Sequence, residues 1–257
     1  GWMSITDGHL IEMRETTVVD TTIAIKLPAT ADARYFTNSV TECVLAEGAT
    51  LNHYKLQREG RQAYHAGHIE VSQGRDSHYV SFVFATGASL SRSNVYTRLG
   101  GEGCGATLNG LYMLDGDQTC DNQTRIEHAE PNCYSREMYK GILDGSSHGV
   151  FNGKVYVHPI AQKTDGKQTN KTLLLSDKAR IDTKPQLEIF ADDVKCTHGA
   201  TVGKLDEIAA FYMKSRGVGA ETTRRLLTYA FAAEVLETIE LEALKEELER
   251  LTLHRYL

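Results

Sequence analysis

The chain has 257 residues, of which 41% are hydrophobic and 24% charged, with a net charge of −6 at pH 7. This length allows one large domain or two smaller ones with a substantial core. Negative net charge argues against a nucleic-acid partner, and no apolar run of about 18 residues occurs that could cross a membrane.

The cysteines indicate a reduced compartment. Five are present, an odd number, widely spaced along the chain and without a CxxC pair. The first residues lack the charged and apolar regions of a signal peptide. We therefore expect a cytoplasmic protein whose cysteines, with the exception of Cys196, are small buried or half-buried residues.

Residues 1–204 are predicted to form a β-domain. Short β-rich runs such as 79–84, 107–114 and 186–190 alternate with glycine and polar residues, roughly every 13 to 18 residues. Weak self-similarity accompanies them, because the sequence GATLN at 48–52 recurs at 105–109. The cadence favours a parallel β-helix, with an irregular antiparallel domain as the alternative.

Residues 205–257 are predicted to be helical. Ile208, Phe211 and Tyr212 have helical spacing, a glycine stop follows at 217–219, and two amphipathic segments lie within 226–239 and 241–251. Two interpretations stay open for this segment. It caps the last coil of the solenoid, or it offers a docking surface to a partner.

The most informative segment is 191–206, which contains Cys196 and His198. On a strand, a spacing of two places both side chains on one face. Thiolate and imidazole are ligands for iron, zinc or copper, and Lys195 could favour the thiolate. A purely structural role for the pair is the alternative. His65 and His68, the other close pair, lie among strand-like residues and are expected to face solvent in loops.

Motifs for phosphate binding or nucleophilic catalysis are absent from the sequence. The segment 199–204 ends in Gly203-Lys204, but its glycines are too close and Leu205 stands where a Ser or Thr would meet magnesium. Neither Gly-x-Ser-x-Gly nor His-Glu-x-x-His occurs.

Several segments closely resemble the SufB/SufD family of iron–sulfur cluster assembly proteins. They are residues 35–42, 56–60, 174–178, 182–189, 191–203 and 211–217. The resemblance is nearer to the SufD type, because Gly199 follows His198 where SufB has a glutamate. The region 182–184 also lacks the cysteine associated with the SufB cluster-building site.

The resemblance implies a right-handed parallel β-helix with helical ends and a non-catalytic scaffold role. It implies a SufB-like partner, with Cys196 and His198 at the shared interface holding a transient iron–sulfur cluster, and none tightly bound to the isolated chain. It also implies a SufC-like ABC ATPase, contacted by Leu205, Asp206, Phe211, Tyr212, Arg216 and Gly217. A homodimer is possible for the isolated chain.

Two other classes of function stay open. A β-helix enzyme acting on a polysaccharide would need paired carboxylates, for which Asp115 with Asp117, or Asp192 with Asp193, are the candidates. A free-standing metal-binding protein would hold metal through Cys196 and His198 of one chain, or of two chains in a homodimer.

Overall fold

Two parallel β-sheets form most of the molecule. The computed structural model describes residues 3–13, 18–25 and 34–255, with side chains from Arg34 onward. One sheet contains, in spatial order, β1 (Met3–Met13), β3 (Tyr35–Leu45), β5 (Tyr64–Gln73), β7 (Leu90–Leu99), β9 (Thr119–His128), β11 (His148–Val157) and β13 (Arg180–Ile189). The other contains β2 (Val18–Ile25), β4 (Thr50–Gln57), β6 (His78–Thr86), β8 (Gly105–Leu114), β10 (Tyr134–Leu143), β12 (Asp165–Leu174) and β14 (Lys195–Gly203). We call these the odd and even sheets.

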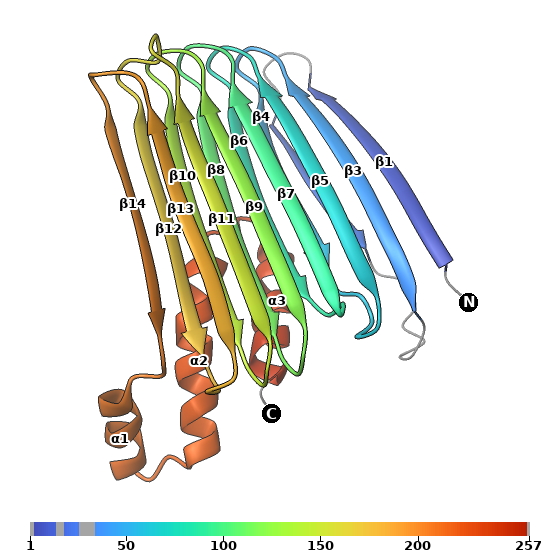
Figure 1. Cartoon of the computed structure of the whole chain (residues 1–257), viewed down its shortest axis with the longest axis vertical. Coiled ribbons are helices and arrows are strands. Elements are labelled where there is room, and N and C mark those ends of the chain that lie inside the picture. The colour runs from blue at the N-terminus through green and yellow to red at the C-terminus, as the bar shows by residue number, and fades with distance from the viewer. Residues whose placement is uncertain (1–2, 14–17, 26–33, 256–257) are drawn as a thin grey trace.

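The chain crosses from one sheet to the other after every strand, so each coil contributes one strand to each sheet (Figure 1). This confirms the predicted parallel β-helix. In the even sheet one register position passes through His78, Gly105, Tyr134, Asp165 and Lys195, so these coils take 27 to 31 residues each. The interval of roughly 13 to 18 residues found in the sequence is therefore the spacing from one strand to the next, about half a coil.

The repeated GATLN sequence does not mark equivalent positions in the coils. Leu51 of the first copy aligns through Tyr79 of β6 with Ala106, whereas Leu108 of the second copy lies two residues further along β8. Both leucines are nevertheless buried, because a shift of two residues keeps a side chain on the same face of a strand. The self-similarity reflects a shared preference for interior positions.

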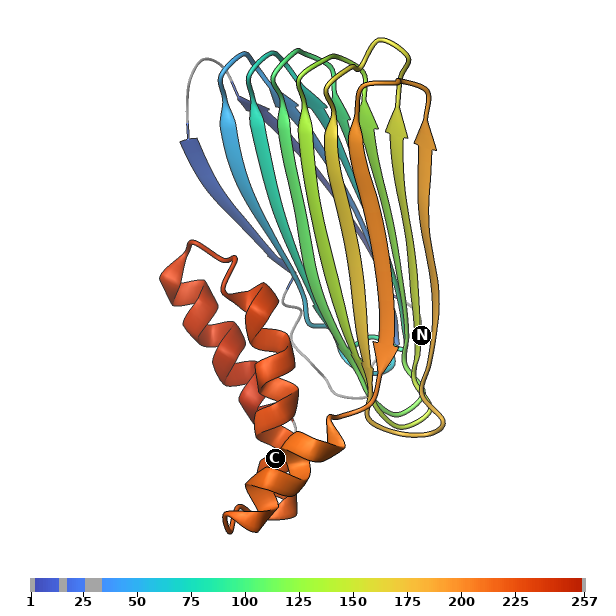
Figure 2. The same cartoon turned by 90° about the vertical axis from the view of Figure 1, so that its left-hand side faces the viewer.

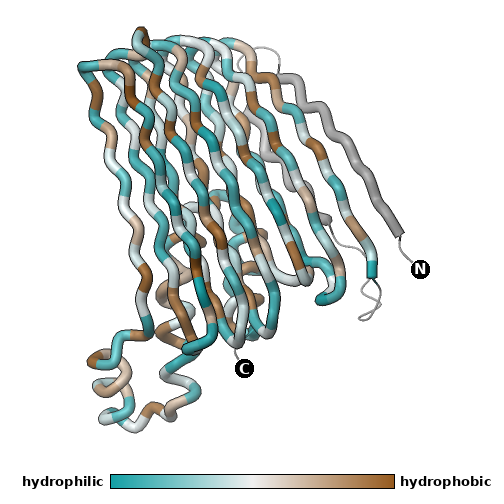
Figure 3. Tube along the Cα trace, viewed as in Figure 1, coloured by the Kyte–Doolittle hydropathy of each residue, from teal (hydrophilic) through white to brown (hydrophobic). Residues whose placement is uncertain are grey.

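Alternation along the strands builds the interior. Buried and partly exposed residues alternate through the whole of β11, and Figure 3 shows hydrophobic and hydrophilic residues alternating along the strands. The inward-facing apolar side chains meet between the sheets, with Leu45, Tyr79, Leu108 and Phe151 at no more than 2% exposure. Strands with one solvated face require this pattern.

Three helices follow the last strand: α1 (Glu207–Ser215), α2 (Ala220–Leu236) and α3 (Glu242–Arg255). The helices α2 and α3 lie along the outer face of the even sheet (Figure 2). Their Val235 and Leu248 are buried against apolar side chains of that sheet such as Phe82 and Leu111. The first of the two interpretations is thus wrong, since these helices cover a face of the sheet and leave the last coil exposed.

A buried lysine helps to hold α2 on the sheet. Lys140 of β10 is 1% exposed at its side chain, and its ammonium group donates to the carbonyl oxygen of Phe231 and to the carboxylate of Glu234. Lys171 of β12 also reaches Glu234, at 2.8 Å. A buried cation is tolerated here because both a carboxylate and a backbone oxygen surround it.

Glycines make room for tyrosines of neighbouring coils. Gly141 of β10 lies in register with Tyr112 of β8, and a Cβ on Gly141 would overlap the Tyr112 ring. We expect Gly141→Ala to lower the free energy of unfolding by about 1–3 kcal/mol, because the closely packed interior leaves the Tyr112 ring no room to move away from the added methyl group. Gly199→Ala is the control, since a Cβ there meets nothing within 4 Å. Urea titration measures both, and equal stabilities would contradict this account of the packing.

Candidate functional site

Cys196 and His198 lie on β14, at the edge of the even sheet. Cys196 is in register with Gly166 of β12, and His198 with Gln168. Being two residues apart on one strand, they share a face with Cα atoms roughly 6.6 Å apart. The structure therefore confirms the predicted strand and the common face of the pair.

The Cys196 side chain points into the solenoid. Its Sγ would lie 3.3 Å from a Cβ on Gly166, and the residue packs, half-buried, against the apolar interior. Burial raises the pKa of the thiol, a backbone hydrogen bond from Gly166 lowers it, and the charge of Asp165 raises it. The net shift is upward, mainly because of burial, and Lys195 is not among its causes. A bound metal would have to displace the proton.

His198 is exposed, but a buried polar column lies behind it. Gln168, in register with His198, is 1% exposed and donates from Nε2 to Oε2 of Glu137 on β10, at 2.7 Å. Burial raises the pKa of Glu137 to about 7, opposed by the hydrogen bond from Gln168. Glu137 and Gln168 were not predicted as site residues, because in a sequence a polar residue at an inward position cannot be told from one at an outward position.

A second buried pair lies behind Cys196. Ser135 of β10 is in register with Gly166, and its hydroxyl lies 2.9 Å from Nε2 of His128 on β9. Burial lowers the pKa of His128 to about 4, so its ring is neutral at pH 7. The neutral imidazole of His128, hydrogen-bonded to Ser135, therefore lies in the coil next to that of Gly166, against which the thiol of Cys196 packs.

The last coil exposes positions that earlier coils bury. Val202 of β14 is 49% exposed, whereas Thr172, its register partner on β12, is 2% exposed. Within the described ranges, no group of three or more His, Cys, Asp and Glu side chains is placed to hold a metal ion. Cys196 and His198 are thus a pair of possible ligands on an exposed strand.

The other cysteines and the second histidine pair lie elsewhere. Cys43, Cys104, Cys120 and Cys133 are buried, as predicted. His65 faces the interior at 3% exposure, with its Nδ1 2.8 Å from Glu59, whereas His68 faces outward near Glu70. The expectation that both histidines lie in loops is wrong, and of the two only His68 faces outward. Both lie on β5, and their spacing of three separates them onto opposite faces.

The helix α1 presents an uncovered apolar face. Asp206 is its N-cap and accepts hydrogen bonds from the amides of Ile208 and Ala209. Ile208 is 81% and Phe211 75% exposed. The guanidinium of Arg216 lies 5.1 Å from the centre of the Tyr212 ring.

The residues around α1 have separate structural roles. Gly217 has φ +86°, the left-handed conformation in which a helix commonly ends, which confirms the predicted glycine stop. Leu205, by contrast, is half-buried between β14 and the helix. The predicted partner-binding residues therefore include exposed side chains as well as Asp206 and Gly217, which shape the backbone.

These features define a parallel β-solenoid with a possible metal-ligand pair on its exposed last strand and helices along one face. Residues 3–231 match the family model described as SUF system FeS cluster assembly, SufBD core domain, and the chain belongs to this family.

Among its relatives, the iron–sulfur cluster assembly protein SufD of Escherichia coli is 39% identical over 93% of this chain and 55% of its own length. A SufBD family protein of Synechocystis is 39% identical over 83% of this chain and 47% of its own length. The chloroplastic protein ABCI7 of Arabidopsis thaliana is 38% identical over 79% and 43%. The chain thus spans about half the length of the curated relatives it matches. Among the helices described, none is long and apolar enough to cross a membrane.

Proposed function

We propose that the chain is a SufD-like, non-catalytic scaffold subunit of a cytoplasmic iron–sulfur cluster assembly complex. It pairs with a SufB-like subunit and a SufC-like ABC ATPase, and a nascent cluster is its cargo. The observation that carries this proposal is the pair Cys196 and His198 on the uncovered last strand. Iron–sulfur clusters take four protein ligands, so a second chain would supply the others.

The exposed last coil supports docking of the SufB-like subunit. Each sheet ends there in an edge strand, β13 or β14, to which a partner can add strands through backbone hydrogen bonds. Apolar side chains lie at these edges, with Phe190 55% and Val202 49% exposed. An interface on these residues would bring a partner's ligands close to Cys196 and His198. A second copy of this chain would use the same edges.

The exposed face of α1 supports docking of the ATPase. Ile208, Phe211 and Tyr212 are large apolar or aromatic residues on a short helix that packs against α2. Such residues dominate the energetics of protein interfaces. Because α1 directly follows β14, movement of a protein bound to the helix would act on the strand that carries the ligand pair.

We expect Phe211→Ser to weaken binding of the SufC-like ATPase by about tenfold or more, because it removes the large aromatic ring from the α1 face. The thermal stability of the chain should change little, since Phe211 is 75% exposed. Titration of the purified chain with the SufC-like and SufB-like proteins of the same source measures both affinities.

Phe190→Ser is the matched control on the other surface. It should weaken binding of the SufB-like protein and leave the ATPase affinity unchanged. If the wild-type chain bound neither protein, the scaffold proposal would be wrong. If Phe211→Ser bound the ATPase as tightly as wild type, the assignment of the α1 surface alone would fail.

A further inference from the structure

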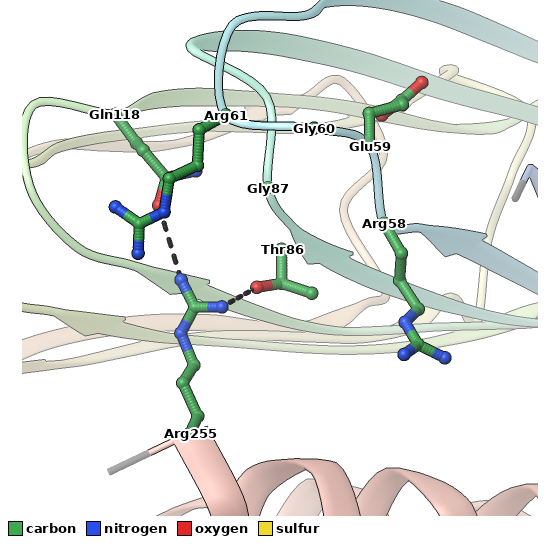
Figure 4. A pocket seen from close by; sticks show the side chains of 8 residues that line it. All are labelled: Arg58, Glu59, Gly60, Arg61, Thr86, Gly87, Gln118 and Arg255. Carbon is green, nitrogen blue, oxygen red and sulfur yellow. Dashed lines mark hydrogen bonds between the residues drawn. The ribbon is translucent and has the colours of Figure 1, made fainter. Parts of the chain in front are cut away.

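A cavity lies between the C-terminal end of α3 and three turns of the solenoid, those that follow β4, β6 and β8. Its volume is about 340 Å³, and its lining residues are Arg58, Glu59, Gly60, Arg61, Thr86, Gly87, Gln118 and Arg255. None of them belongs to β13, β14 or α1. Three of the eight carry guanidinium groups, and Figure 4 shows how their side chains lie.

Arg255 is held in place and retains an unused donor. From α3 its guanidinium donates to the hydroxyl of Thr86 and to Oε1 of Gln118, the latter at 3.3 Å (Figure 4). Gln118 is 2% exposed and is fixed in turn, because its Nε2 donates to the carbonyl oxygen of Ala88 at 2.8 Å. The Nε of Arg255 is buried and has no hydrogen-bond partner in the described part of the chain. A buried donor of this kind calls for an acceptor.

The carboxylates around the cavity do not balance its arginines. Arg61 and Arg255 both pair with Asp115, at 2.6 Å and 3.2 Å. The third guanidinium, that of Arg58, is 3.6 Å from Glu247, which Arg250 also contacts at 2.7 Å.

Glu59 also lines the cavity, but its carboxylate does not offset the positive charge of these arginines. Its carboxylate accepts hydrogen bonds from Gln57 and His65 and points away from the arginines in Figure 4. The side chains around the cavity therefore carry more positive than negative charge. Their planar guanidinium groups can donate hydrogen bonds to a ligand.

We propose that this cavity binds a small oxyanion through Arg61 and Arg255, with Arg58 at its rim. Guanidinium groups present paired donors that match the oxygens of phosphate and carboxylate groups. An anion there would supply an acceptor for the Nε of Arg255 and offset the excess charge. The contacts of Arg255 with Thr86 and Gln118 also attach α3 to the solenoid, so the test must separate binding from stability.

Isothermal titration of the chain with inorganic phosphate, pyrophosphate and citrate tests the proposal at about 10 mM ionic strength, where the screening length is about 30 Å. We expect saturable binding at one site. Saturation by phosphate or pyrophosphate would identify a phosphate ligand, and saturation by citrate would identify a carboxylate ligand. Arg61→Gln and Arg255→Lys should each weaken binding by about tenfold or more. The lysine variant keeps the charge but loses Nε and the planar pair of donors.

Arg92→Gln is the matched control. Arg92 is an exposed arginine paired with Asp121 at 3.0 Å, so the variant makes the same change in net charge away from the cavity. Its affinity should stay within about twofold of wild type. Thermal unfolding without ligand shows whether the variants remain folded. The proposal fails if none of the three probes saturates, if Arg61→Gln binds as tightly as wild type, or if Arg92→Gln weakens binding equally.

Discussion

The double variant Cys196→Ala/His198→Ala is expected to lower the iron and acid-labile sulfide of the assembled complex by about tenfold or more. Even partners that only orient a metal ligand cost about 10–100-fold in affinity or activity when they are removed. Loss of two ligands should cost at least as much. Anaerobic co-purification with the SufB-like and SufC-like proteins, followed by iron and sulfide analysis, measures the effect.

The fold should survive this double change. His198 is exposed, and Cys196 is half-buried on β14, an edge strand that pairs with a neighbour on one side only. Thr197→Ala, an exposed neighbour on the opposite face of β14, is the control and should keep its cluster. An intact complex with unchanged iron and sulfide in the double variant would place the cluster ligands on the partner alone.

The solenoid could be predicted because its strands follow a local rule. Inward positions such as Val155 and Val157 of β11 alternate with outward ones, and the turns between strands recur at nearly constant spacing. The thiol–imidazole pair was predictable for the same reason, since a spacing of two fixes a common face whatever the rest of the fold.

The placement of the helices could not be predicted in this way. An amphipathic pattern shows that Val235 and Leu248 face something apolar but does not identify it. The complementary signal lay in the even strands, where β4, β6 and β8 bury both faces over most of their length. Such strands have lost their alternation because helices cover their outer side.

The polar residues of the interior were the other omission. Glu137, Gln168 and His128 occupy inward positions where the pattern predicts apolar side chains, yet all three are at most 3% exposed. Only the register shows that Gln168 can reach Glu137, because the two belong to successive coils 31 residues apart. In the structure these residues are recognisable by their hydrogen bonds and, for Glu137 and His128, by their shifted pKa values.

Glu137 is accordingly expected to make the stability of the protein depend on pH. Burial raises its folded-state pKa from 4.5 to about 7, so the folded chain keeps a proton that the unfolded chain releases between these values. Its contribution to stability is complete below about pH 4.5 and is lost as pH rises through 7. Glu137→Gln, which keeps an oxygen to accept from Gln168, should therefore be more stable than wild type at pH 8, by about 3 kcal/mol.

Comparison of the two proteins at each pH isolates this carboxyl group. His128 and His65 have pKa values lowered mainly by burial, so they weaken the fold as pH falls, in wild type and variant alike. Urea unfolding at pH 4.5, 6, 7 and 8 should show a difference that is small at the lowest pH and grows through 7. A constant difference would mean that folding does not raise the pKa of Glu137. The column behind His198 would then be fully charged at neutral pH. A metal ion bound at the last strand would lie two coils from an anion instead of from a carboxyl group that is about half protonated at pH 7.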